Sequence, residues 1–162
     1  MERRDKYNYY LDIAQTVAER ATCLRRKFGS IIVKDDEIIS TGYVGAPRGR
    51  KNCCDIGECT RERLNIPQGE RYELCRSVHA EANAIISAAR RDMLGATLYL
   101  ACVDAVTGEL TAGTSPCSMC KRQIINSGIS KVVIRDTSES CRAIYVEDWV
   151  ANDESLDGVR GY

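Results

Sequence analysis

His79-Ala80-Glu81 and Pro116-Cys117-Ser118-Met119-Cys120 are the two segments that decide how this chain is expected to fold and what chemistry it carries. One imidazole and two thiolates are three ligands for a tetrahedral zinc ion, one fewer than a closed structural site uses. The open fourth position holds a water molecule, as catalytic zinc sites do. We therefore predict that His79, Cys117 and Cys120 bind a catalytic zinc ion, and that Glu81 takes a proton from the water and passes it to a leaving group.

An alternative is a purely structural zinc site that includes Cys117 and Cys120, with His79 as an ordinary histidine. Cys-x-x-Cys pairs occur in many structural zinc sites. However, His79 is the only histidine in the chain and falls inside the pattern. The glutamate two residues after it and the proline before the first cysteine favour the catalytic interpretation.

The residues around both segments indicate that each lies at the start of a helix. Pro116 is typical of a first helical turn, where an amide has no partner. Cys117 and Cys120 are three residues apart and therefore share a face of that turn. The helix dipole and unpaired amides there favour thiolates. Residues 78–91 carry alanines and isoleucines at helical spacing, which predicts a second helix with His79 and Glu81 in its opening turn.

The order of the other elements predicts an α/β fold. An apolar helical stripe covers residues 10–21, and two β-rich runs, 30–33 and 38–43, flank a turn and are expected to pair as a hairpin. Further strands are predicted at 97–103 and 131–134. The chain has 162 residues, of which 44% are hydrophobic, and no linker or repeat divides it, so residues 1–162 are expected to form one domain.

Charge and cysteine content narrow the class of partners. Lysine plus arginine equals aspartate plus glutamate, 23 each, so the net charge is zero and no nucleic-acid partner is expected. The chain has one phenylalanine and one tryptophan, which offers little for base stacking along a strand. No run of residues is long enough to cross a membrane, and the first residues are charged and unlike a secretory signal. We expect a cytoplasmic protein whose nine cysteines serve mainly in metal binding rather than in disulfides.

The two zinc segments, together with residues 22–29, 40–49, 75–85 and 124–129, resemble the cytidine and deoxycytidylate deaminase superfamily, most closely the deoxycytidylate (dCMP) deaminases. The resemblance covers most of the chain to about residue 135. It implies a three-layer α-β-α fold with a mixed central sheet. It also implies zinc-dependent hydrolysis of dCMP to dUMP and ammonia, a homo-oligomer, with a hexamer favoured, and dCTP and dTTP as effectors.

The resemblance also suggests where the nucleotide binds. It places Lys27 beside the phosphate, backbone amides near Ala80 beside the base, and Val44 and Ser115 among the other substrate contacts. Val44 is a departure, because the family usually has an asparagine there that is thought to bind the sugar. Valine cannot donate that hydrogen bond, so discrimination between ribose and deoxyribose should relax.

A second zinc ion is predicted in the long polar segment 44–77. Its ligands would be four of the five cysteines in or near that segment, namely Cys23, Cys53, Cys54, Cys59 and Cys75. A structural zinc would order a loop of this length, which otherwise lacks periodicity. The alternative is that these are buried free cysteines, which behave as small apolar residues. Residues 103–114 are expected to be a smaller insertion with a hairpin turn beside the pocket.

Three other functions stay open on the sequence alone. A cytidine or CMP deaminase, or another free cytosine nucleoside or nucleotide deaminase, would use the same zinc site. A deaminase of RNA or single-stranded DNA shares the motif but usually needs basic and aromatic surface. A non-catalytic, zinc-stabilised binding module would have no need of Glu81.

Overall fold

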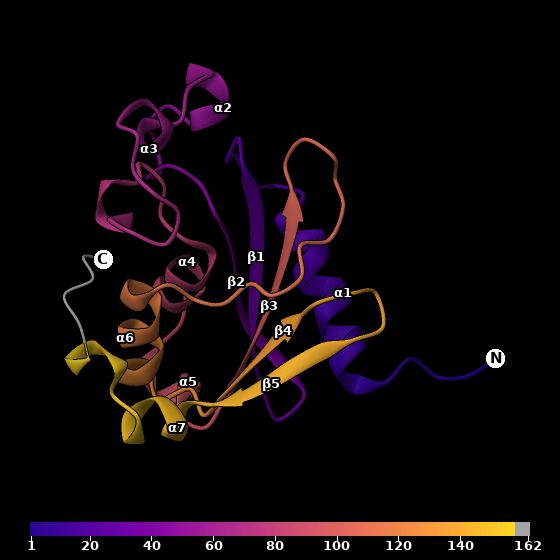
Figure 1. Ribbon diagram of the computed structural model, residues 1–162. Coiled ribbons are helices and arrows are strands. Elements are labelled where there is room, and N and C mark those ends of the chain that lie inside the picture. Colours follow the sequence, from indigo (N-terminus) through magenta and orange to yellow (C-terminus); the bar gives the residue numbers. More distant parts are fainter. Residues whose placement is uncertain (158–162) are drawn as a thin grey trace.

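The computed structural model describes residues 1–157, which fold around one five-stranded sheet in the order β2-β1-β3-β4-β5 (Figure 1). β3 and β4 are parallel and all other neighbours are antiparallel, so the sheet is mixed. The strands are β1 (Arg26–Lys34), β2 (Glu37–Tyr43), β3 (Thr97–Asp104), β4 (Lys131–Arg135) and β5 (Cys141–Tyr145). The predicted hairpin of β1 and β2 is confirmed.

Helices cover both faces of this sheet. Among the described helices, only α1 (Lys6–Ala18) lies on one face, against β1, β2, β3 and β4. The opposite face carries α4 (Ala80–Ile86), α5 (Arg90–Met93), α6 (Ser118–Ser127) and α7 (Val146–Ala151), as Figure 1 shows. The predicted three-layer α-β-α architecture is therefore confirmed.

Alternation along the strands divides the core in two. Ile31 and Val33 of β1 pack against α1, whereas Ile32 between them packs beneath the helices of the other face. Successive side chains of a strand point to opposite faces, so one continuous apolar run supplies both cores.

Two glycines let helices approach the sheet more closely than a side chain would allow. A Cβ atom on Gly42 of β2 would lie 2.3 Å from the Ala80 carbonyl oxygen of α4. A Cβ atom on Gly29 of β1 would lie 2.2 Å from the Ala14 carbonyl oxygen of α1. The first approach sets the height of α4, and with it His79, above the sheet.

The predicted helix over residues 78–91 is wrong in its second half. α4 ends at Ile86, Ala89 is extended, and α5 begins separately at Arg90. The break lets Met93, 3% exposed, enter the core, and the Arg90 Nε–H donates to the Asn126 carbonyl oxygen at 2.8 Å. α6 also begins later than predicted, since Cys117 is its extended N-cap and Pro116 precedes the helix.

The two insertions lie at the same end of the sheet as the zinc motifs (Figure 1). Residues 44–77 carry α2 (Cys53–Ile56), α3 (Thr60–Arg63) and the short 3₁₀ helix η1 (Tyr72–Leu74), and a backbone bridge between Gly45 and Val78 closes the segment. Residues 103–114 form the predicted small turn, with Val103 bridged to Leu110.

The remaining elements are β5 and α7, which no pattern in the sequence predicts, and the 3₁₀ helix η2 (Glu154–Leu156). Among the described residues no helix has the length and apolarity that crossing a bilayer requires.

Candidate active site

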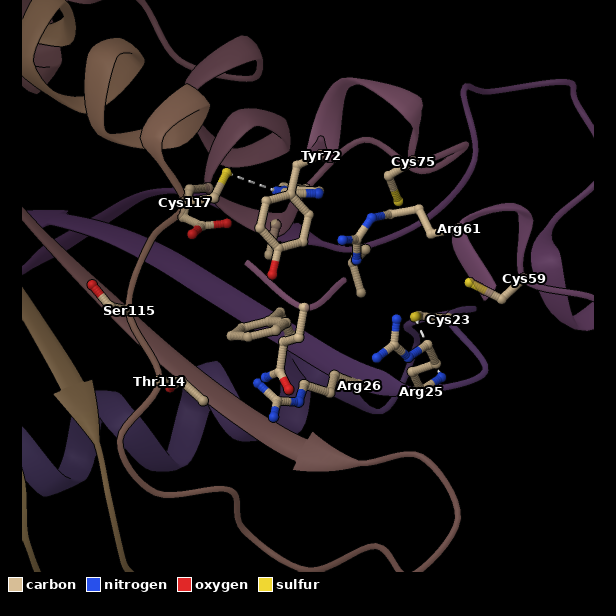
Figure 2. A pocket seen from close by; sticks show the side chains of 16 residues that line it. Cys23, Arg25, Arg26, Cys59, Arg61, Tyr72, Cys75, Thr114, Ser115 and Cys117 are labelled. Carbon is tan, nitrogen blue, oxygen red and sulfur yellow. Dashed lines mark hydrogen bonds between the residues drawn. The ribbon is translucent and has the colours of Figure 1, made fainter. Parts of the chain in front are cut away.

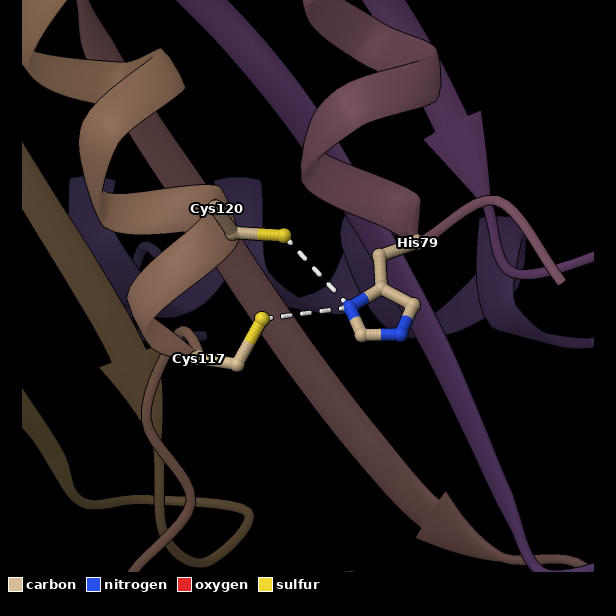
Figure 3. Close-up of side chains that lie close together, drawn as sticks. All are labelled: His79, Cys117 and Cys120. Atoms are coloured by element: carbon tan, nitrogen blue, oxygen red, sulfur yellow. Dashed lines mark hydrogen bonds between the residues drawn. The ribbon is translucent and has the colours of Figure 1, made fainter. Parts of the chain in front are cut away.

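Two helix N-termini bring the zinc motifs together. His79 is the N-cap of α4 and Cys117 is the N-cap of α6, while Cys120 lies in the first turn of α6. The His79 Nδ1 atom lies 3.5 Å from the Sγ atom of Cys117 and 3.5 Å from that of Cys120 (Figure 3). Within residues 1–157, these three side chains form the one group of three or more potential ligands whose donor atoms all lie within 4.8 Å of one another.

This geometry fits zinc. Zn–S and Zn–N bonds of about 2.3 and 2.0–2.1 Å, opened to a tetrahedral angle, place sulfur and nitrogen about 3.5 Å apart. The observed separations match that spacing. Nitrogen and sulfur donors are also the chemistry that zinc prefers. Three protein ligands leave one position for water or substrate.

Glu81 stands in the first turn of α4, directly beside this ligand group. Its side chain is buried, and burial raises the pKa of its carboxyl above the ordinary value, although the His79 charge acts in the opposite direction. A carboxyl group with a raised pKa can take and return a proton near neutral pH. Glu81 is therefore suited to proton transfer.

The ligand side chains influence one another's protonation. Burial favours neutral His79, but hydrogen bonds to Cys117 and Cys75 outweigh it and raise the pKa of His79 to about 11. A hydrogen bond to Cys120 lowers the pKa of Cys117 to about 4. Burial of the thiol acts in the opposite direction, and a hydrogen bond to His79 lowers the pKa further. The lowered pKa of Cys117 favours its thiolate, which is the form in which a cysteine binds a metal ion.

The ligand group lies at one end of a pocket whose walls come from both insertions and from β1 (Figure 2). Of the predicted substrate contacts, Val44, Ala80 and Ser115 line this pocket. Lys27 is not among the described residues that line it, whereas its neighbours Arg25 and Arg26 are. The reason is strand alternation: Arg26 and Phe28 share the pocket side of β1 and Lys27 points to the other side.

The structure gathers some of the five additional cysteines and separates others. Cys23, Cys59 and Cys75 line the pocket, and Cys53 is buried beside them with its Sγ atom 3.7 Å from the Ser77 Oγ atom. Burial raises the pKa of Cys53, with smaller contributions from the other three thiols. Cys54 is exposed. Their donor atoms do not have ligand spacing in residues 1–157.

Sequence reasoning missed several pocket residues, among them Arg61, Gln68 and Tyr72 of the 44–77 segment. Arg61 is 4% exposed, and its guanidinium carbon lies 4.2 Å from the centroid of the Tyr72 ring. No local pattern marks these residues, because segment 44–77 lacks periodicity.

Comparison with known proteins agrees with the geometry. Residues 4–136 match the family described as the cytidine and deoxycytidylate deaminase zinc-binding region. The deoxycytidylate deaminase of Mycobacterium phage D29 is 41% identical over 139 residues, which cover 82% of this chain and 96% of that protein. The deoxycytidylate deaminase of Saccharomyces cerevisiae is 35% identical over 126 residues, which cover 78% of this chain and 36% of that longer protein.

A solved structure extends the likeness to the fold. The apo dCMP deaminase of cyanophage S-TIM5 superposes with a TM-score of 0.57 and 26% identity, over 84% of this chain and 86% of that one. The matched region contains both zinc motifs and all five strands except the last. This chain therefore belongs to the cytidine and deoxycytidylate deaminase family.

Proposed function

We propose that this protein is a zinc-dependent hydrolase that converts dCMP and water to dUMP and ammonia. The observation that carries the proposal is the placement of His79, Cys117 and Cys120 at tetrahedral spacing, with buried Glu81 beside them, in a pocket that also contains arginines. The extended similarity to the phage D29 deoxycytidylate deaminase supports dCMP as the substrate.

The chain's residues divide the work of the reaction. A zinc ion held by His79, Cys117 and Cys120 supplies Lewis acidity, which makes water a nucleophile near neutral pH. Glu81 would take one proton from the attacking water and give it to N3 of the pyrimidine, then take the remaining proton of the new C4 hydroxyl and give it to the departing amino group. The C–O bond forms at C4, the C–N bond breaks, and ammonia leaves. The backbone at Ala80 and the side chain of Ser115, which both line the pocket, are our candidates for holding the ring.

The charge of the pocket favours a nucleotide over a nucleoside. Arg25, Arg26 and Arg61 line it, against the single carboxylate of Glu81. Arg25 is paired with Glu62 at 3.1 Å, and Arg61 is engaged with backbone carbonyls. Arg26 is thus our choice for the phosphate in place of Lys27, because a guanidinium binds phosphate oxygens in a bidentate fashion.

A substrate panel tests the proposal. Cytidine, deoxycytidine, CMP, dCMP and dCTP are supplied at equal concentration to the zinc-loaded full chain, and ammonia release is measured. dCMP should react fastest, with a measurable side activity on CMP because Val44 offers the sugar no hydrogen bond. Equal rates with deoxycytidine and dCMP would replace the nucleotide assignment by a nucleoside one.

The second zinc ion is proposed at Cys23, Cys53, Cys59 and Cys75, with exposed Cys54 left out. The thiols of Cys23, Cys59 and Cys75 are near enough to Cys53 to raise its pKa electrostatically, and this proximity supports the proposed site. Elemental analysis should then find about two zinc ions per chain, the sum of one open and one closed site.

Assembly, regulation and location extend the same proposal. We infer a single domain over residues 1–162, of which 158–162 lie outside the described residues, in a cytoplasmic homo-oligomer, with a hexamer favoured. dCTP is expected to activate it and dTTP to inhibit it. Initial rates measured with and without each triphosphate test the regulatory part by itself.

A further inference from the structure

Tyr72 and Arg61 are two pocket residues that the zinc chemistry does not use. Both come from the 44–77 segment, Tyr72 from η1 and Arg61 from α3. In Figure 2 they stand side by side, with Tyr72 between Cys117 and Arg61 and its hydroxyl directed toward the side of the pocket where Arg26 lies. Tyr72 therefore lies between the metal ligands and the arginine side of the pocket.

The Tyr72 ring is held by three contacts. The guanidinium carbon of Arg61 lies 4.2 Å from the ring centroid, and the Gly69 amide donates a hydrogen bond to the phenol oxygen at 3.3 Å. The ring also meets the His79 imidazole edge-on, with centroids 5.7 Å apart and an interplanar angle of 80°. An aromatic ring fixed in this way needs no further ordering when a ligand arrives.

Arg61 is fixed in turn by the backbone that leads to Tyr72. Its Nη2 group donates to the Pro67 carbonyl oxygen at 2.8 Å and to the Glu70 carbonyl oxygen at 2.6 Å. These bonds hold the turn 67–70, which leads through Arg71, with its left-handed φ of 50°, into Tyr72. Arg61 thus connects α3 to η1 and sets the position of the Tyr72 ring.

We propose that Tyr72 is a specificity-determining wall of this pocket, against which the nucleotide's ring packs, and that Arg61 is the positioning residue that holds it there. The inference rests on the proposed function, because it takes a pyrimidine nucleotide as the ligand. Arg61 lies over one face of the Tyr72 ring, and we assign the pocket-facing part of the ring that Arg61 does not cover to that ligand. Pyrimidine rings pack on aromatic faces, and the contact with His79 places such a ring beside the zinc site.

The test measures dUMP binding by isothermal titration calorimetry on the zinc-loaded full chain, beside KM and kcat for dCMP. Tyr72→Leu should weaken dUMP binding and raise KM by about tenfold, because base stacking on an aromatic side chain contributes a change of this order. kcat should change less than KM, since Glu81 and the metal ligands are untouched. Tyr72→Phe keeps the ring and should bind dUMP within about twofold of the unmodified chain.

Arg61→Lys tests the positioning role without removing the charge. One ammonium cannot both stack on Tyr72 and hold two carbonyls, so dUMP binding should weaken as in Tyr72→Leu. Arg63→Lys is the matched control, because Arg63 lies in the same helix, is largely exposed and pairs with Glu58. It should leave binding unchanged. Elemental analysis should find the same zinc content in all five proteins.

Unchanged dUMP affinity in both Tyr72→Leu and Arg61→Lys would overturn the inference, as would an equal loss in Tyr72→Phe and Tyr72→Leu. Should Tyr72→Leu not fold, the contrast between Arg61→Lys and Arg63→Lys decides alone. Failure of the proposed function looks different: the unmodified chain would then prefer another compound of the substrate panel. Tyr72→Leu would still weaken the binding of that compound if the Tyr72 ring packs against its base.

Discussion

At the scale of single residues, Glu81 is the side chain to which we assign proton transfer, apart from the three proposed metal ligands. It is buried beside the ligand group but is not itself needed as a ligand. Glu81→Gln keeps the volume and removes the proton-accepting group, so turnover should fall by a factor of about 10²–10⁴. Zinc content and thermal stability should stay as in the unmodified chain. An active Glu81→Gln protein with bound zinc would show that another group moves the proton.

Arg26 and Lys27 are adjacent cations that the strand directs to opposite sides. Arg26→Ala should raise KM for dCMP by about tenfold or more, since a charge-assisted hydrogen bond contributes about 1.5–3 kcal/mol. The same change should hardly affect deoxycytidine, which has no phosphate. Lys27→Ala is the control and should leave both values unchanged. A reversed pattern would restore the original expectation for Lys27.

The grouping of His79, Cys117 and Cys120 could be predicted from the sequence because coordination chemistry dictates the types and spacing of zinc ligands. The expectation that Lys27 binds the phosphate is different: Lys27 does not line the pocket, whereas its neighbour Arg26 does. A shift of one position along a strand moves a side chain to the other face of the sheet. Arg61 and Tyr72 were missed for a different reason. Their approach to His79 depends on how segment 44–77 folds back, and that follows from long-range contacts rather than local pattern.

At the scale of elements, the two close helix approaches offer a matched pair of variants. Gly42→Ala pushes against α4, and Gly29→Ala pushes against α1 on the opposite face. Each should destabilise the fold by about 1–3 kcal/mol, as overpacking does. Gly42→Ala should in addition weaken zinc binding, because α4 begins at His79. Chelator competition measures this, and equal zinc affinity in both variants would mean that α4 shifts without moving its N-terminus.

The segment that leads into Cys117 is tied to β4 and β5 by a small polar network. Asp136 accepts a hydrogen bond from the Gly113 amide and pairs with Arg142, both at 2.8 Å, and Arg142 also donates to the Thr114 carbonyl oxygen. The hydrogen bond with Arg142 lowers the pKa of Asp136 below its ordinary value. The carboxylate therefore stabilises the native state.

This pKa shift sets the sign of a pH effect. A lowered native pKa means that the stabilisation is complete above the unfolded value, about 3.9, and is lost as pH falls through the native value. Asp136→Asn should cost about 1 kcal/mol near neutral pH and much less in strong acid. Melting temperatures of both proteins across acidic pH should converge. A constant difference down to the lowest pH would assign the loss to the hydrogen bonds instead of the charge.

The helices and strands that could be predicted from the sequence are those with a strong hydrophobic pattern. The hairpin and the strands of the core alternate or run continuously apolar, and their pairing follows. β5 has only partly buried and exposed residues, and α7 buries little beyond Val146, so neither has a clear signal. The break after Ile86 was missed because residues 87–89 suit a helix equally well, and only the burial of Met93 decides against it.

At the scale of the whole molecule, the α4–α5–α6 side carries a large apolar side chain, Ile86, that a monomer would leave in water. Ile86 is 74% exposed, and a groove beside it is lined by Ile85, Met93 and Met119 together with polar side chains. Burying such a patch is the usual driving force for stable self-association. This side of the molecule is therefore our candidate for the contact between copies.

Light scattering coupled to gel filtration tests this assembly. The unmodified chain should elute as a homo-oligomer, with a hexamer favoured, and Ile86→Arg should shift it to smaller species, because an unpaired charge in an apolar contact costs several kcal/mol. Val106→Arg is the control, since Val106 is 86% exposed on the 103–114 insertion, away from this groove. A monomer at assay concentration would refute self-association altogether. An oligomer that both variants leave intact would place the contact on another face.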